Sequence, residues 1–197
     1  MAATQNRRRS IAILIVALGV VAALALFIEL GGYNVAADAP HTAPVRTFLD
    51  TVRRRSIAAR AAGIALPRDL GSPQRIQAGA GLYGEMCATC HGGPGLEKTE
   101  LAQGLYPQAP DLARGSALTP VQQFWIIKHG VKMTAMPAWG RTHPDPLIWD
   151  MVAFLQRLPH LSAKQYRALV ASAPEDHDEM MQEASEAHHH EGGEAHH

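Results

Sequence analysis

The chain has 197 residues, with 18 basic residues balanced by 18 acidic ones. This length allows one ordinary folded domain with additional segments. The charges are unevenly spread: the last twenty or so residues are acidic and histidine-rich without Lys or Arg, while much of the basic excess lies in residues 7–9 and 46–75. This pattern does not form a nucleic-acid patch, so we expect no nucleic acid as a partner. With only two cysteines, a disulfide framework is excluded.

An uncharged apolar run follows the basic N-terminus. Residues 10–28, from Ser10 to Ile28, come directly after three arginines at 7–9. The run is long enough to cross the hydrocarbon core and predicts a single transmembrane helix in a lipid bilayer. By the positive-inside rule, we expect residues 1–30 to form a cytoplasmic N-terminus and the membrane anchor. The rest of the chain then lies outside the cytoplasm. A cleaved signal peptide is the alternative, but this apolar run exceeds the usual signal core of about 7–15 residues.

Residues 31–71 are expected to form a linker with a basic amphipathic helix. Its apolar residues recur near helical spacing and are Val45, Phe48, Leu49, Val52, Ile57 and Ala61. Its polar part is supplied by Arg46, Arg53, Arg54, Arg55 and Arg60. Two interpretations stay open here: the helix packs on the following domain with solvated arginines, or it lies on a membrane surface or a partner.

Residues 72–173 are expected to form one all-α domain. Ser72-Pro73 and Thr119-Pro120 each combine an N-cap with proline at the first helical position, which predicts helices over 74–86 and 121–128. A third helix is expected after the Pro-Asp-Pro segment at 144–146, and a fourth, capped by Ser162, runs to about residue 172. Residues 92–115 are predicted to be mostly loop. No alternating β pattern of useful length is present.

The two cysteines and a histidine form the motif Cys87-x-x-Cys90-His91. This spacing is typical of a c-type haem attachment site, in which two thioether bonds hold the porphyrin and the histidine binds the iron. We therefore predict one covalently attached haem c. A thioredoxin-like pair would need a βαβ context, and a zinc site would need a second pair of ligands, and the sequence shows neither.

The order of these features resembles a class I c-type cytochrome of the mono-haem, membrane-anchored bacterial kind, over residues 74–159. The resemblance rests on Gly79-x-x-x-Tyr83-x-x-x-Cys87, the attachment motif, Pro110-Asp111-Leu112, Met136-Pro137 and the helix from Met151 to Leu155. It implies a cytochrome c-like haem domain with an N-terminal transmembrane helix. It also implies that the first and last helices cross, with Gly79 and Tyr83 against Met151 and Phe154.

The resemblance further implies a set of site residues. Pro110 is expected to offer its carbonyl to the imidazole N–H of His91. Met136 is expected to be the second axial ligand, since a thioether favours reduced iron, with Met133, His129 and His143 as alternatives. Residues expected to pack against the haem are Tyr83, Leu112 and Trp139.

The expected function is transfer of single electrons between respiratory-chain partners, from a donor complex to a terminal oxidase or reductase. The chain itself is then an electron carrier without enzymatic activity, or a subunit of a larger oxidoreductase complex. It would be a single-pass protein of the bacterial inner membrane with its haem domain in the periplasm.

Two other functions are compatible with the sequence. One is a metal-handling protein in which the histidine-rich tail, residues 174–197, captures copper, with Cu, Zn or Ni as candidate ions. The other is a haem-based subunit that reacts with peroxide or a gas. The tail itself is expected to be disordered.

Overall fold

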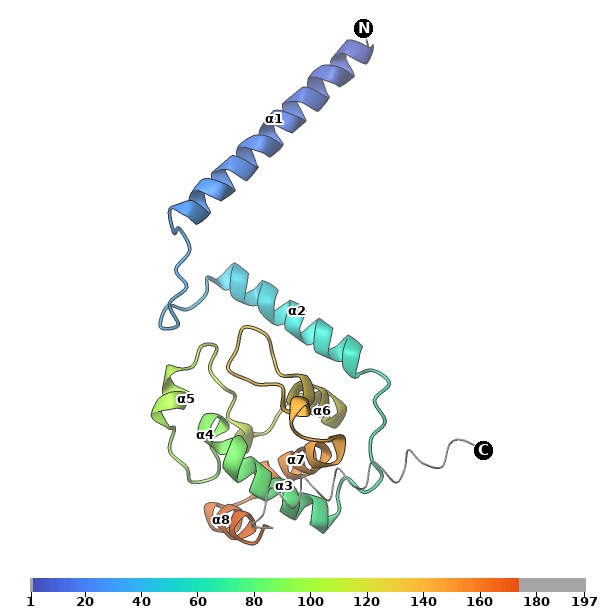
Figure 1. Cartoon of the computed structure of the whole chain (residues 1–197), viewed down its shortest axis with the longest axis vertical. Coiled ribbons are helices and arrows are strands. Elements are labelled where there is room, and N and C mark those ends of the chain that lie inside the picture. The colour runs from blue at the N-terminus through green and yellow to red at the C-terminus, as the bar shows by residue number, and fades with distance from the viewer. Residues whose placement is uncertain (1, 174–197) are drawn as a thin grey trace, which may run out of the picture. The chain divides into compact units, whose positions relative to one another are not determined.

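The computed structural model describes residues 2–173, and it divides the chain into two units, the first ending at Ala39 and the second beginning at Pro40 (Figure 1). The predicted tail at 174–197 lies outside the described residues. The longer helices are α1 (Ala2–Glu29), α2 (Ala43–Ala61), α3 (Pro73–Met86), α6 (Pro120–His129), α7 (Asp145–Arg157) and α8 (Ala163–Ala171). The shorter ones are α4 (Ala88–His91), α5 (Glu100–Gly104) and the 3-10 turns Leu112–Arg114, Trp139–Arg141 and Leu158–His160.

Helix α1 dominates the first unit. Within its segment Thr4–Glu29, an 18-residue window has a mean hydropathy of 3.2, and none of that window is buried. It is long and apolar enough to cross a membrane, and an N-terminal signal sequence has the same properties. The helix therefore supports membrane anchoring.

The second unit contains only helices and turns through residue 173, which confirms the predicted all-α class. Helices α3, α6 and α8 begin where a local side chain caps them. The hydroxyls of Ser72, Thr119 and Ser162 accept hydrogen bonds from backbone N–H groups three residues later. Thr119 and Ser162 also form complete capping boxes with the glutamines that follow them. These contacts satisfy N–H groups that a helix start otherwise leaves without partners.

Two apolar clusters form the core, and α3 contributes to both. The first consists of Leu82, Phe124, Ile127, Leu147, Ile148, Trp149, Met151 and Val152. The second consists of Ala80, Tyr83, Phe154, Leu158 and Tyr166. In the first cluster Trp149 stacks on Phe124 with ring centroids 4.2 Å apart, so α6 and α7 are joined by a large aromatic contact.

Helices α3 and α7 pack closely where Gly79 meets α7. A Cβ at Gly79 would overlap the backbone carbonyl of Asp150 and stand 3.0 Å from the Cβ of Phe154. The rings of Tyr83 and Phe154 lie 5.2 Å apart one turn further along. The crossing of the first and last helices of the domain, predicted from the resemblance, is therefore present, with glycine allowing the backbones to approach.

Replacing Gly79 with Ala is expected to destabilise the fold by about 1–3 kcal/mol, the usual cost of forcing an extra methyl group into a packed contact. The overlap is with backbone, which cannot turn aside as a side chain can. Urea unfolding measures the change. Gly104→Ala in α5 is the matched control, because a Cβ there meets nothing within 4 Å. Equal stability of the two variants would contradict the close crossing.

Helix α2 lies against α6 in the second unit. Its residues Ile57 and Ala61 are buried, at 4% and 2% exposure. Before α2 begins, the backbone N–H of His41 donates a hydrogen bond of 2.6 Å to the hydroxyl of Tyr106. Of the two interpretations of the basic helix, packing on the domain is therefore observed for one of its faces. The helix belongs to the second unit, which begins at Pro40.

Candidate haem-attachment site

The end of α3 and the short helix α4 position the two cysteines. The N–H of Cys87 donates to the carbonyl of Tyr83 at 3.0 Å, and the N–H groups of Cys90 and His91 both donate to the carbonyl of Cys87, at 3.1 and 2.9 Å. Residues three apart in such a turn lie on one side of it, so the backbone places Cys87 and Cys90 as neighbours. The hydroxyl of Tyr83 donates to the carbonyl of Gly92 at 2.8 Å and ties the turn to α3.

The imidazole of His91 is oriented by a residue far along the chain. Its Nδ1 lies 2.9 Å from the carbonyl oxygen of Pro110. A carbonyl can only accept a hydrogen bond, so Nδ1 carries a proton, and Nε2 is the ring nitrogen left to bind a metal. A hydrogen bond at the ring nitrogen that does not bind the metal fixes the tautomer of a ligating histidine and raises its basicity as a ligand.

The thiols do not resemble a reactive redox pair. Burial, and then the neighbouring Cys90, raises the pKa of the Cys87 thiol to about 12. Reactive Cys-x-x-Cys pairs instead depend on a lowered pKa. Within residues 2–173 no three His, Cys, Asp or Glu side chains gather as ligands for a metal ion, so the zinc interpretation gains no support there.

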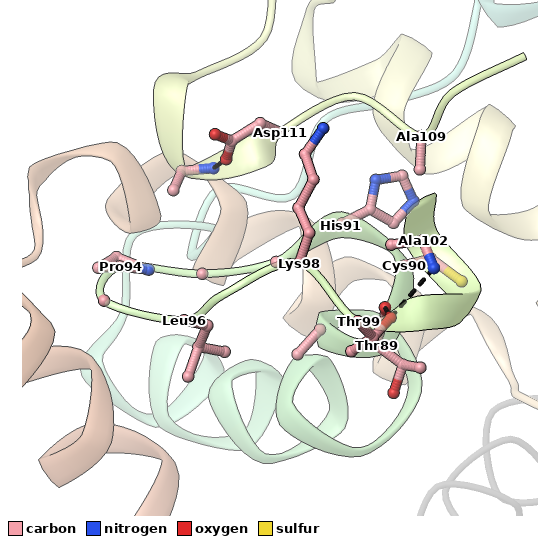
Figure 2. Close-up of a pocket in the computed structure, with 15 residues that line it drawn as sticks. Thr89, Cys90, His91, Pro94, Leu96, Lys98, Thr99, Ala102, Ala109 and Asp111 are labelled. Carbon is pink, nitrogen blue, oxygen red and sulfur yellow. Dashed lines mark hydrogen bonds between the residues drawn. The ribbon is translucent and has the colours of Figure 1, made fainter. Parts of the chain in front are cut away.

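A hollow of about 240 Å³ lies between α4 and the loop that follows it. Cys90 and His91 of α4 line it, together with Ala102 of α5 and Ala109 of the loop after α5 (Figure 2). Tyr83, Leu112, Met136 and Trp139, the predicted packing and ligand residues, do not line it. Cys87 and Leu112 pack instead on the second apolar cluster, of which Tyr83 is a member, and Met136 and Trp139 pack on the first.

Sequence reasoning missed α5 and the residue that starts it. Thr99 accepts a hydrogen bond from the N–H of Ala102 at 3.1 Å and donates one of 2.6 Å to the carbonyl of Thr89 inside the attachment motif. It thereby braces the loop of residues 92–113 against α4. The pair Thr99-Glu100 is an N-cap signal that the loop assignment overlooked.

The loop that carries Met136 is held by backbone contacts at its base. The N–H of Val131 donates to the carbonyl of Met136 at 3.2 Å. Thr134 closes the loop from inside, because its hydroxyl donates to the carbonyl of Val131 at 2.8 Å and accepts from the N–H of Met136 at 3.1 Å. Gly130 has φ +65°, and a Cβ there would stand 2.7 Å from the carbonyl of Met136, so glycine is needed at this turn.

Replacing Thr134 with Val removes both hydroxyl contacts while keeping the side-chain shape. A hydrogen bond contributes about 1 kcal/mol, so we expect the amide of Met136 to exchange with deuterium about fivefold faster or more. Thr134→Ser keeps the hydroxyl and should keep the slow exchange. Equal exchange in wild type and the valine variant would show that the hydroxyl does not hold the loop.

The alternatives to Met136 differ in their surroundings. Met133 is 77% exposed and has φ 58°, so its side chain lies on the outside of the loop. His129 is exposed and its ring lies 4.9 Å from that of Trp125. His143 is buried, with Nδ1 2.8 Å from the hydroxyl of Thr142. Met136 is the partly buried thioether of this loop.

These residues fit a covalently held haem. Both cysteines are free thiols on one turn, and the hydrogen bond from Nδ1 of His91 leaves Nε2 as the donor atom that haem iron requires. No contact among the described residues links Met136 to His91, so the role of Met136 as an iron ligand remains a prediction.

The attachment motif lies within a segment that is similar to known c-type cytochromes. Residues 74–155 match the family model described as Cytochrome C oxidase, cbb3-type, subunit III. The chain is similar to the cbb3-type cytochrome c oxidase subunit FixPc of Rhizobium leguminosarum bv. viciae, with 30% identity over 122 residues. That alignment covers 58% of this chain and 38% of the relative. No solved structure matches the chain. Residues 74–155 are therefore similar to the c-type cytochrome domain of cbb3-type subunit III, and a c-type cytochrome domain implies covalently bound haem c.

Proposed function

We propose that this chain is a membrane-tethered mono-haem cytochrome c that passes single electrons between respiratory-chain partners, from a donor complex to a terminal oxidase or reductase. Cys87 and Cys90 would form the thioether bonds, and His91 and Met136 would be the axial ligands. The observation that carries the proposal is the contact between Nδ1 of His91 and the carbonyl of Pro110, because it prepares the ring as a metal ligand.

Haem iron would supply the one-electron chemistry, and the protein supplies orientation and surroundings. The Pro110 carbonyl holds the His91 ring and raises its basicity. Met136 would add a soft, neutral sulfur, a donor that favours reduced iron. If His91 and Met136 both bind the iron, no position would be left for a substrate, which supports a carrier in preference to an enzyme. The similar Rhizobium protein is named as an oxidase subunit, and this favours a place for the chain within or beside such a complex.

The proposed location is the bacterial inner membrane, spanned once by α1, with the haem domain in the periplasm. The arginines at 7–9 before the apolar segment support this orientation. Retention of the anchor is part of the proposal. A tether keeps the haem near membrane partners and substitutes for tight binding.

An acidic partner would be steered by basic residues that are not already neutralised. Lys128 pairs with Asp145 at 2.6 Å, and Arg114 pairs with Asp111 at 3.2 Å. Lys132 and Arg141 are exposed on the loop that carries Met136 and on the turn that follows it, and they are the better candidates for steering.

A redox titration of the purified full chain tests the proposal. We expect a single one-electron transition and no change in the spectrum of the reduced protein on adding carbon monoxide at neutral pH. Binding of carbon monoxide would reveal an open iron position and favour the peroxide- or gas-reactive alternative, which the comparisons do not support. The metal-handling alternative depends on residues 174–197, outside the described part of the chain, and the comparisons do not support it either.

A further inference from the structure

Helix α2 has a second face that the domain does not cover. Ile57 and Ala61 are buried in the second unit, whereas Phe48 and Val52 are 67% and 49% exposed. Phe48 and Val52 are four residues apart, so they lie side by side on one face of the helix. An exposed phenylalanine beside an exposed valine on a packed helix indicates a surface that meets something else.

The same helix is strongly basic. It contains five arginines and one acidic residue, a formal charge of +4. All five arginines are exposed. The single acid, Asp50, pairs with Arg53 at 2.9 Å, and no other acidic side chain lies on the helix to neutralise the rest. Arginine stems lie along apolar surface while their charged ends reach outward, which suits a helix at a lipid interface.

The position of α2 in the sequence favours a bilayer as the occupant. Residues 30–42 join α1 to α2. Fully extended, a segment of this length reaches about 45 Å at most, so a membrane that holds α1 is always within reach of α2. A basic helix with an apolar stripe is attracted to anionic headgroups and buries its apolar side chains at their depth.

We infer that the exposed face of α2 binds anionic phospholipid headgroups and inserts Phe48 and Val52 at the membrane interface. The opposite face of α2 packs on the domain, so this contact would hold the domain at the bilayer surface in a fixed orientation. The inference needs α1 in the membrane and does not depend on the haem ligands.

The test uses the full chain reconstituted through α1 into nanodiscs. Phe48→Trp places a fluorophore on the exposed face, and Leu101→Trp, an exposed position on α5, is the matched control. Brominated phospholipid quenches only tryptophan that enters the interface. The extra fluorescence of each variant over the parent protein is measured in two kinds of bilayer. One contains phosphatidylcholine alone, and the other also contains phosphatidylglycerol.

We expect bromine quenching at position 48 in anionic bilayers, little in phosphatidylcholine alone, and none at position 101 in either. Arg55 is seven residues from Phe48, on the same face of the helix, and an arginine contributes about 1 kcal/mol at an anionic surface. Changing Arg55 to Gln should therefore lower the ratio of bound to free helix about fivefold. Circular dichroism confirms that the variants stay folded. The inference would be overturned by equal quenching in both lipids or by no effect of changing Arg55. It would also be overturned by the absence of quenching at position 48, which would favour a protein partner.

Discussion

Replacing Met136 with Ala is expected to abolish the sulfur-to-iron charge-transfer band of the oxidised protein. A thioether ligand stabilises reduced iron, so the midpoint potential should also fall, by on the order of a tenth of a volt or more. The reduced variant should bind carbon monoxide, because an axial position is then open. Absorption spectra of the oxidised and reduced protein and a redox titration measure all three changes.

Met133→Ala is the matched control for this result. Met133 is the same residue type three positions earlier, yet it is 77% exposed, whereas Met136 packs on the first apolar cluster. The control should keep the band, the potential and the resistance to carbon monoxide. A band that survives in Met136→Ala and disappears in Met133→Ala would transfer the ligand role to Met133.

Replacing Arg75 with Met is expected to lower the free energy of unfolding by about 3 kcal/mol, since breaking one side of a largely buried ion pair leaves a charge without compensation. Arg75 on α3 donates to Asp150 on α7 at 2.6 Å and to Asp69 at 2.9 Å. Asp150 is only 9% exposed. Arg157→Met, at an exposed arginine at the end of α7, is the control and should change stability by less than about 0.5 kcal/mol.

The loss should depend on pH. Burial raises the pKa of Asp150 and its bond to Arg75 partly offsets this, so removing Arg75 raises that pKa further. A carboxyl whose pKa is higher in the folded than in the unfolded protein lowers the free energy of unfolding as pH rises from the unfolded value to the folded one. The hydrogen bond from Arg75 lowers the pKa of exposed Asp69, which contributes stability that is lost as pH falls through its folded value. Both effects make the difference in free energy of unfolding between wild type and variant largest at neutral pH. The difference becomes smaller below pH 3.8, the ordinary pKa of an aspartate.

Urea unfolding at several pH values measures this dependence. Adding Asp150→Asn to the Arg75→Met variant removes the uncompensated charge and should restore part of the stability at neutral pH. A destabilisation that is independent of pH and is not relieved by the asparagine would show that Arg75 acts through packing alone.

The fold was predictable wherever short-range signals decide it. Ser72, Thr119 and Ser162 cap their helices through bonds to N–H groups three residues on, and this spacing is visible in the sequence. The packing of α2 was not predictable in this way. It depends on buried Ile57 and Ala61 and on a bond from His41 to Tyr106, 65 residues away. An amphipathic pattern shows that a helix has faces, and tertiary structure decides what each face meets.

The candidate site divides in a similar way. The attachment motif needs only five consecutive residues, so its chemistry could be predicted directly. The partner of His91 lies 19 residues away, and only the resemblance pointed to Pro110. Thr99 and Thr134 could not be assigned from the pattern, because a threonine in a loop shows its role only when the backbone groups it bonds are in place. Met136 as a ligand remains a prediction.

Mass spectrometry of the full chain under denaturing conditions tests the central proposal most directly. We predict that the polypeptide carries the mass of one haem, and that peptide mapping places it on the segment containing Cys87 and Cys90. Cys87→Ser combined with Cys90→Ser should yield the bare polypeptide mass. A wild-type chain with the bare mass, or with haem attached elsewhere, would contradict the assignment of Cys87 to His91 as the haem-attachment site.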